Sequence, residues 1–277
     1  MTDFGHYTTM HGLMGVVRDQ ALWATNIRYL NDEQEYLHAL ALLEQLKPRI
    51  ASLVGDKSNR GSSEFLSLAY GEIDNFNCEV GHNLYTVSFS TETDLLSQWR
   101  GYCPNNNGYC VIFNAKAIFR DLSKYSIAAR FVRCVYKDTK KARLIIDTFV
   151  REWNEYCKAD DASKRELIVS DLAGEVLRIA SYSKHSSFEE ENEYRIVLDP
   201  AMQMIDQEIL FREGKYSVIP YLKIPAPRRY IRKIIVGPTV NQALAMRALE
   251  EFVRAYFSPK EVAKLVLKGS EIPYRTL

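Results

Sequence analysis

Alternation of polar and apolar residues predicts several short strands along the chain. Residues 4–9 and 22–25 are rich in aromatic and β-branched side chains, and residues 84–90 alternate with a period of two, so all three segments are predicted strands. Further strands are predicted over residues 109–113, 129–136, 194–198, 216–222 and 231–236. The almost uninterrupted apolar run at residues 109–113 favours a central position in the sheet.

Helical spacing of apolar residues predicts the segments between these strands. Helices are expected over residues 10–18, from a cap at Asn31-Asp32-Glu33 to about Lys47, and over residues 64–77, 139–157, 162–182 and 242–256. Pro48 is expected to end the second helix. Short strands separated by unequal helices predict a single α+β domain over residues 1–277, with a helical insert at about residues 139–182.

Composition narrows the class of protein without identifying a partner. The 277 residues are 47% hydrophobic and 26% charged, as in ordinary globular proteins, and a net charge of +1 excludes a strong overall field toward nucleic acid or membrane. The five cysteines form no C-x-x-C pair, and no run of eighteen apolar residues occurs. Because no basic segment followed by an apolar core opens the chain, we expect a cytoplasmic protein with no membrane partner.

Polar residues gather at three of the predicted strands. The three groups are His6-x-Thr8, Ser88-x-Ser90 and Glu191-x-Glu193. If the last segment is extended, its two carboxylates point to the same face. Each group alone also fits a purely structural interpretation. His6 would be a partly exposed histidine, the two serines would lie on the solvent face of a strand, and the two glutamates would form a solvated acidic turn.

Together the three groups fit one kind of chemistry. Cleavage of a ribosyl C–N bond passes through an oxocarbenium-like transition state, which a nearby carboxylate stabilises. Neutral hydrogen-bonding groups are also needed to orient the nucleotide. A histidine, hydroxyl groups and a Glu-x-Glu on three strands would supply that set.

The same residues carry a resemblance to known families. The ordered segments are His6-Tyr7-Thr8-Thr9, Leu22-Trp23-Ala24-Thr25, Leu30-Asn31-Asp32-x-x-Glu35, Ser88-Phe89-Ser90 with Trp99-x-x-Tyr102 and Gly108, and Glu191-x-Glu193-Tyr194-Arg195-Ile196. Over nearly the whole chain this order resembles the bacterial domain of unknown function 2971 family. The opening segment also resembles the DNA-targeting ADP-ribosyltransferase toxins, and the late Glu-x-Glu is similar to the catalytic signature of ADP-ribosyltransferases. This resemblance implies an ADP-ribosyltransferase-like split mixed β-sheet.

The resemblance also implies roles for particular residues, with NAD as the substrate. Glu193 would be the catalytic carboxylate, and Glu191 would orient the acceptor or a water. The NAD pocket would comprise His6, Tyr7, Thr8, Ser88, Ser90, Trp99 and Arg100. The glycine-containing NAD loop of the toxins is not recognisable, and three arginines, Arg28, Arg100 and Arg195, are candidates for the NAD phosphates. Arg195 alternatively pairs with a carboxylate inside the fold.

These observations favour a cytoplasmic bacterial enzyme that transfers ADP-ribose from NAD to a macromolecular acceptor, nucleic acid or protein. Such an enzyme would act as a toxin or anti-phage defence effector, and an antitoxin or regulatory protein would be its partner. The basic stripe at residues 228–233 would contact acceptor phosphates or form a solvated strand end.

Two alternatives belong to other functional classes. One is a non-enzymatic module that binds a nucleotide, nucleic acid or protein. The other is a metal-dependent nuclease using Asp32, Glu35 and the acidic run at residues 189–193. We expect no metal site, because these carboxylates lack a companion cluster of ligands.

Overall fold

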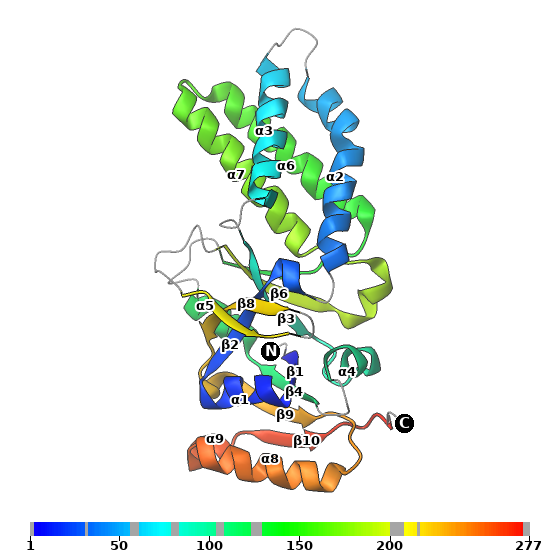
Figure 1. Ribbon diagram of the computed structural model, residues 1–277, viewed down its shortest axis with the longest axis vertical. Helices are drawn as coiled ribbons and strands as arrows, with labels where there is room; N and C mark the ends of the chain where they lie inside the picture. The colour runs from blue at the N-terminus through cyan, green and yellow to red at the C-terminus, as the bar shows by residue number, and fades with distance from the viewer. Residues whose placement is uncertain are drawn as a thin grey trace.

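The chain folds into a β-sheet part and a helical part, which lie one above the other in Figure 1. The computed structural model describes residues 3–30, 33–55, 61–78, 83–103, 108–122, 129–199, 208–214 and 217–273. The strands are β1 (Phe4–Thr9), β2 (Ala21–Asn26), β3 (Tyr85–Ser90), β4 (Gly108–Phe113), β5 (Arg130–Arg133), β6 (Glu193–Leu198), β7 (Leu210–Glu213), β8 (Val218–Pro225), β9 (Ile231–Val236) and β10 (Val266–Gly269). The α-helices are α1 (Met10–Arg18), α2 (Glu33–Val54), α3 (Gly61–Cys78), α4 (Leu96–Tyr102), α5 (Ala115–Leu122), α6 (Asp138–Lys158), α7 (Ala162–Ser181), α8 (Gln242–Tyr256) and α9 (Pro259–Val262).

One mixed sheet contains all of these strands. Its order is β10-β9-β4-β1-β3-β2-β8-β7, while β6 pairs with β3 and β5 pairs with β6. β10 and β9 run parallel, and the other pairs are antiparallel. The predicted α+β class is therefore confirmed. The predicted central position of residues 109–113 is confirmed too, because β4 lies between β1 and β9 and is buried along its whole length.

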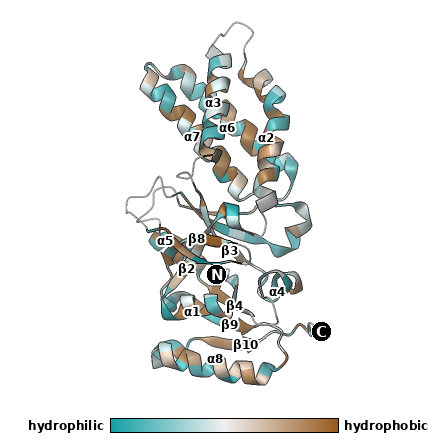
Figure 2. Cartoon of the chain, in the orientation of Figure 1, coloured by the Kyte–Doolittle hydropathy of each residue, from teal (hydrophilic) through white to brown (hydrophobic). Residues whose placement is uncertain are grey.

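The helical part has a hydrophobic core of its own. Helix α3 packs on α7, α6 packs on α7, and α2 packs on α6. Apolar side chains of all four helices form one buried cluster between them. Hydrophobic and hydrophilic residues alternate along each of these helices in Figure 2, as in amphipathic helices. The two helices of the predicted insert therefore share their core with α2 and α3, which precede them by some sixty residues or more in the sequence.

The predicted end of the second helix is wrong. Helix α2 continues to Val54, and Pro48 lies inside it. A proline costs a helix interior about 3 kcal/mol. Beyond it, however, Ile50 and Val54 are completely buried in the helical core, and burial of each such side chain contributes about 1.5–3 kcal/mol. Tertiary packing therefore outweighs the local cost.

Several short elements carry too weak a local pattern to be predicted. β7 and β10 have four residues each, and α5 has eight. Helix α3 begins at Gly61, slightly before the predicted start at residue 64. The predicted cap at Asn31 and Asp32 lies outside the described residues. Among the described residues, no helix has the length and apolar character needed to cross a membrane.

Candidate functional site

Strand β3 joins two halves of the sheet and leaves a gap between them. Ser90 pairs with Gly5 of β1 on one edge and with Glu193 of β6 on the other. At the opposite end of β3, Thr86 pairs with Thr25 of β2 on the same edge as β1, because β6 occupies the whole opposite edge. β1 and β2 thus hold the two ends of one edge of β3, and the sheet is split between them.

A cleft of about 950 Å³ lies at this split. Its volume is at the upper end of the range typical of small-molecule sites. The predicted site residues that line it are His6, Tyr7, Thr8, Ser88, Ser90 and Glu193. Segments far apart in the sequence therefore converge on one cavity, whereas Glu191, Trp99 and Arg100 are not among its lining residues.

His6 is held as a neutral imidazole. Its Nδ1 lies 2.9 Å from the Ser88 carbonyl oxygen, which can only accept, so Nδ1 carries the proton in this contact. Burial lowers the pKa of His6, the hydrogen bond to Ser88 raises it, and the charge of Arg212 lowers it further, with a net downward shift. The other ring nitrogen, Nε2, is then an acceptor in the cleft wall.

The two neighbours of His6 in its motif differ in role. The Tyr7 hydroxyl donates to the Glu92 carbonyl and accepts from the Leu95 backbone N–H, at 2.8 and 2.9 Å, so it fixes the segment before α4. Thr8 lines the cleft, and a Cβ at position 12 would lie 1.9 Å from its Oγ1. Glycine at position 12 therefore leaves room for the Thr8 hydroxyl against α1.

The two serines of the Ser88-x-Ser90 group do not lie on a solvent-exposed face of β3. Ser88 is half-buried and lines the cleft. Ser90 is buried; its hydroxyl donates to the Glu191 carbonyl at 2.5 Å and accepts from the Glu92 N–H at 2.9 Å. Ser90 therefore anchors the turn before β6, while Ser88 is the serine whose side chain is partly open to the cleft.

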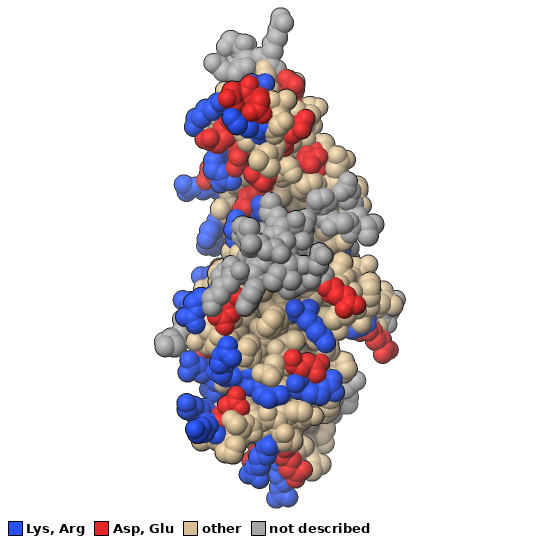
Figure 3. All heavy atoms as spheres, turned by 90° about the vertical axis from the view of Figure 1, so that its left-hand side faces the viewer, with Lys and Arg blue, Asp and Glu red and all other residues tan. Residues whose placement is uncertain are grey.

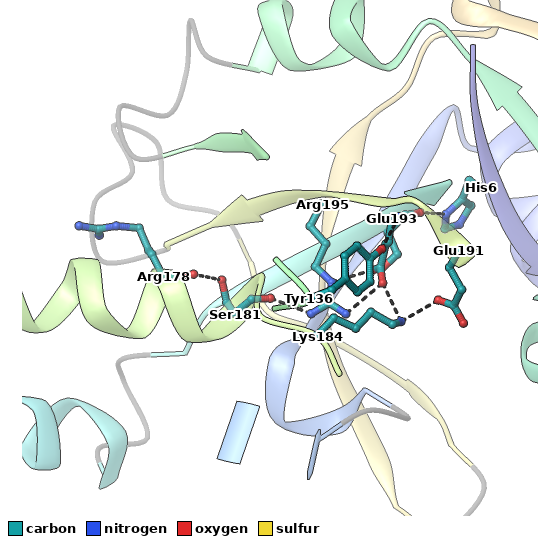
Figure 4. A network of polar contacts seen from close by, with 9 residues as sticks. His6, Tyr136, Arg178, Ser181, Lys184, Glu191, Glu193 and Arg195 are labelled. Carbon is teal, nitrogen blue, oxygen red and sulfur yellow. Dashed lines mark hydrogen bonds and ion pairs between the residues drawn. The ribbon is translucent and has the colours of Figure 1, made fainter. Parts of the chain in front are cut away.

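Glu193 belongs to a buried charge cluster formed by Lys184, Glu191, Glu193 and Arg195, which Figure 4 shows from close by. Its Oε1 accepts from Arg195 Nε and its Oε2 from Lys184 Nζ, both at 2.7 Å. Glu193 is only 3% exposed, Lys184 1% and Arg195 2%. The alternative prediction that Arg195 pairs with a carboxylate inside the fold is confirmed.

The cluster keeps Glu193 ionised. Burial alone would raise its pKa, but the charges of Arg195 and Lys184 and their hydrogen bonds outweigh burial and lower the pKa to about 2. The Glu193 backbone N–H donates to the Tyr136 hydroxyl at 2.7 Å, and Arg195 donates to the Ser181 carbonyl at 2.7 Å. The carboxylate is therefore fixed in position as well as in charge.

Glu191 reaches the cluster through a reversal of the backbone. The condition that the segment Glu191-Asn192-Glu193 is extended is not met, because Glu191 ends a 3₁₀ helix, η3 (Ser186–Glu191), and Asn192 is left-handed with φ 44°. Asn is one of the few residues that adopts this conformation readily. The reversal nevertheless brings both carboxylates to Lys184, whose Nζ lies 2.7 Å from Glu191 Oε2 and 2.7 Å from Glu193 Oε2.

Trp99 and Arg100 lie on α4 beside the cleft. Trp99 is 1% exposed, packs edge-on against Tyr7 with ring centroids 4.7 Å apart, and donates its indole N–H to Asp94 at 2.8 Å. It is therefore part of a small core between α4 and the sheet. Arg100 is exposed.

Sequence reasoning missed two basic residues at the site. Lys184 follows α7 and belongs to no motif, so only its burial next to Glu193 reveals it. Arg212 lies on the four-residue strand β7 and lines the cleft. Of the arginines considered from the sequence, Arg28 donates to the Asn77 carbonyl and Arg195 to Glu193, so both are engaged inside the fold.

The basic stripe at residues 228–233 is tied to the fold. Arg228 donates to the Val17 carbonyl at 2.7 Å and lies over the ring of Phe257, while Arg229 lies 3.6 Å from Asp121. On the face drawn in Figure 3, acidic side chains are interspersed among the basic ones. This face therefore presents no field of a single sign.

The described residues provide no set of metal ligands for the alternative of a metal-dependent nuclease. Within the ranges that the structure describes, no group of three or more His, Cys, Asp or Glu side chains is arranged to hold a metal ion. Asp32 and the side chain of Glu35 lie outside those ranges. Glu191 and Glu193 have Lys184 as their shared counter-ion.

Residues 98–196 match the family described as "Protein of unknown function (DUF2971)". The matched range includes the whole buried charge cluster but not His6 or the serine pair, so it is shorter than the nearly complete coverage that the motifs indicated. No curated protein and no solved structure matches the chain. Over this central part, the chain is similar to the DUF2971 family.

Proposed function

We propose that this protein is an ADP-ribosyltransferase-like enzyme that binds NAD in the cleft and transfers ADP-ribose to a macromolecular acceptor. The observation that carries the proposal is that His6, Ser88 and Glu193, from three separate strands, line one cleft at the split of the sheet. This set joins an ionised carboxylate with neutral hydrogen-bonding groups, as cleavage of a ribosyl C–N bond requires.

In the proposed reaction, the bond between C1′ of the ribose and the nicotinamide nitrogen breaks, and nicotinamide leaves with the electron pair. A nucleophile of the acceptor forms the new bond to C1′ and loses its proton. Glu193, ionised because its pKa is about 2, would face the positive charge that develops on the ribose. His6 Nε2 would accept from a ribose hydroxyl or the nicotinamide amide, and the Ser88 hydroxyl would donate to or accept from the same groups.

The acceptor would be a nucleic acid or a protein, and the protein would act as a toxin or anti-phage defence effector. An antitoxin or regulatory protein would then restrain it. These parts of the proposal rest on the resemblance of the motifs alone. They are tested by offering DNA, RNA and cell protein separately as acceptors.

The direct test is transfer of label from NAD carrying ³²P in its adenylate phosphate, together with nicotinamide release. The variant Glu193→Gln should lose transfer, whereas Glu190→Gln is the matched control, since Glu190 is exposed in the 3₁₀ helix η3 that precedes β6. Circular dichroism establishes that both variants are folded at the assay temperature. Undiminished labelling by folded Glu193→Gln, or neither labelling nor nicotinamide release by the wild-type protein, would overturn the proposal.

A second candidate is a non-enzymatic binding module. It is favoured by the neutrality of the buried charge cluster, in which two carboxylates face two cations. Paired in this way, Glu193 stabilises a cation less than an isolated carboxylate does. NAD binding by calorimetry without nicotinamide release would favour a nucleotide-binding module, and absence of NAD binding would favour a nucleic-acid- or protein-binding one.

A further inference from the structure

One wall of the cleft, formed by residues of β2, β3 and β7, contains polar atoms that lack hydrogen-bond partners among the described residues. Trp23 Nε1, Thr86 Oγ1 and Arg212 Nε are buried and have no hydrogen-bond partner within the described chain. All three side chains line the cleft. A buried polar atom without a partner costs about 1–3 kcal/mol, so three in one wall require an explanation.

These side chains form one group. Arg212 donates through Nη2 to Thr25 Oγ1 at 3.0 Å, and its guanidinium carbon lies 6.0 Å from the centre of the Trp23 ring. Thr25 is the cross-strand partner of Thr86. We call Trp23, Thr25, Thr86 and Arg212 the donor cluster.

The donor cluster carries an unneutralised positive charge. Arg212 forms no ion pair with a carboxylate in the part of the chain that the structure describes. Burial lowers its pKa, but a guanidinium stays charged in proteins. The indole and guanidinium N–H groups can only donate, so the complementary ligand is an acceptor with negative charge.

We propose that the donor cluster binds the diphosphate of the dinucleotide, with Arg212 as the main phosphate-binding residue. The identity of the ligand rests on the proposed function, whereas the preference for a phosphate oxyanion rests on the donors themselves. Arg212 lies near enough to His6 for its charge to lower the pKa of that imidazole. The phosphates would therefore lie on the β7 side, and the nicotinamide ribose between His6 and Glu193.

Calorimetry on the full chain with ADP-ribose, inorganic pyrophosphate and adenosine tests the assignment. Arg212→Gln should weaken ADP-ribose and pyrophosphate binding at least about 10-fold and leave any adenosine binding unchanged. Arg212→Lys should recover part of the affinity, because it restores the charge without the planar fork. Trp23→Phe, which keeps a ring but removes the N–H, should cause a smaller loss.

Arg229→Gln is the matched control, because Arg229 has a side chain that is 63% exposed and lies outside the cleft. Its affinity for all three probes should equal that of the wild type. Unchanged ADP-ribose affinity in folded Arg212→Gln would overturn the assignment. It would also be overturned if the wild-type protein bound neither ADP-ribose nor pyrophosphate. If the protein binds ADP-ribose through Arg212 but releases no nicotinamide from NAD, the assignment of the phosphate site stands and the proposed enzymatic function is refuted.

Discussion

The ammonium group of Lys184 lies 2.7 Å from Oε2 of Glu193, and both side chains are almost completely buried. The carboxylate of Glu193, which is predicted to be catalytic, is thus also part of a buried ion pair within the fold. Removing one partner of a buried ion pair leaves the other without compensation, which costs far more than the net value of the pair. Changes at Glu193 or Lys184 therefore require a measurement of stability beside any measurement of activity.

Lys184→Met should lower the free energy of unfolding by about 3–5 kcal/mol, because Glu191 and Glu193 would lose their shared cation. Urea unfolding followed by circular dichroism measures the change. Lys158→Met is the control: Lys158 pairs with Glu155 at 2.8 Å on the surface, where such pairs contribute about 0–1 kcal/mol. Equal effects of the two substitutions would contradict the role of Lys184.

Glu193 should make stability depend on pH in acid. Its pKa is about 2 in the folded protein against 4.5 as the ordinary value, so its contribution is complete above pH 4.5 and is lost as the pH falls toward 2. The difference amounts to about 3 kcal/mol. Unfolding measured across this range should show a decline in the wild type that is shallower in Glu193→Gln. Parallel profiles of the two proteins would show that Glu193 is not responsible.

His6 should be neutral at pH 7 and protonated on Nδ1. The cause is burial, which lowers its pKa, together with the contact of Nδ1 with the Ser88 carbonyl. Long-range ¹⁵N–¹H correlation spectra of the imidazole distinguish the tautomers directly. Because the folded pKa lies below the ordinary 6.5, the contribution of His6 to stability is present above pH 6.5 and declines as the pH falls. A charged ring at pH 7 would exclude this assignment.

His6→Asn should distinguish the structural role of Nδ1 from the proposed ligand-binding role of Nε2. The Asn amide can still donate to the Ser88 carbonyl, as Nδ1 does at 2.9 Å, but it lacks an acceptor at the position of Nε2. We expect the unfolding midpoint to change little and the affinity for NAD to fall about 10-fold, as for loss of one hydrogen bond. His38→Asn serves as the control, since the side chain of His38 is exposed on α2 and lies outside the cleft, so the affinity for NAD should not change.

The serine pair should divide into a structural and a ligand-facing residue. Ser90→Ala leaves the Glu191 carbonyl and the Glu92 N–H without their buried partner and should cost about 1–3 kcal/mol of stability. Ser88→Ala should change stability by less than about 0.5 kcal/mol and weaken NAD binding instead. Thermal unfolding and calorimetry of the two variants should therefore rank them in opposite orders.

Local pattern determined most of the elements. The period-two alternation of β3 and the helical spacing of α1 follow directly from which faces are buried, so these segments and the α+β class were predictable. The same pattern placed His6 and Ser88 on strands and Glu193 directly before one, whereas β6 in fact begins at Glu193. It failed at Pro48, where burial of Ile50 and Val54 outweighs a local preference.

Only the tertiary structure decided what surrounds those residues. That His6 and Glu193 share a cleft follows from β3 pairing with β6 along one edge and with β1 and β2 at the ends of the other. Lys184 contacts Glu193 across the reversal between α7 and β6, and Arg212 contacts Thr25 on a strand far away in the sequence. Periodicity records neither contact. Periodicity reports which face of an element is buried, whereas partners, charge state and cavity depend on how the elements pack.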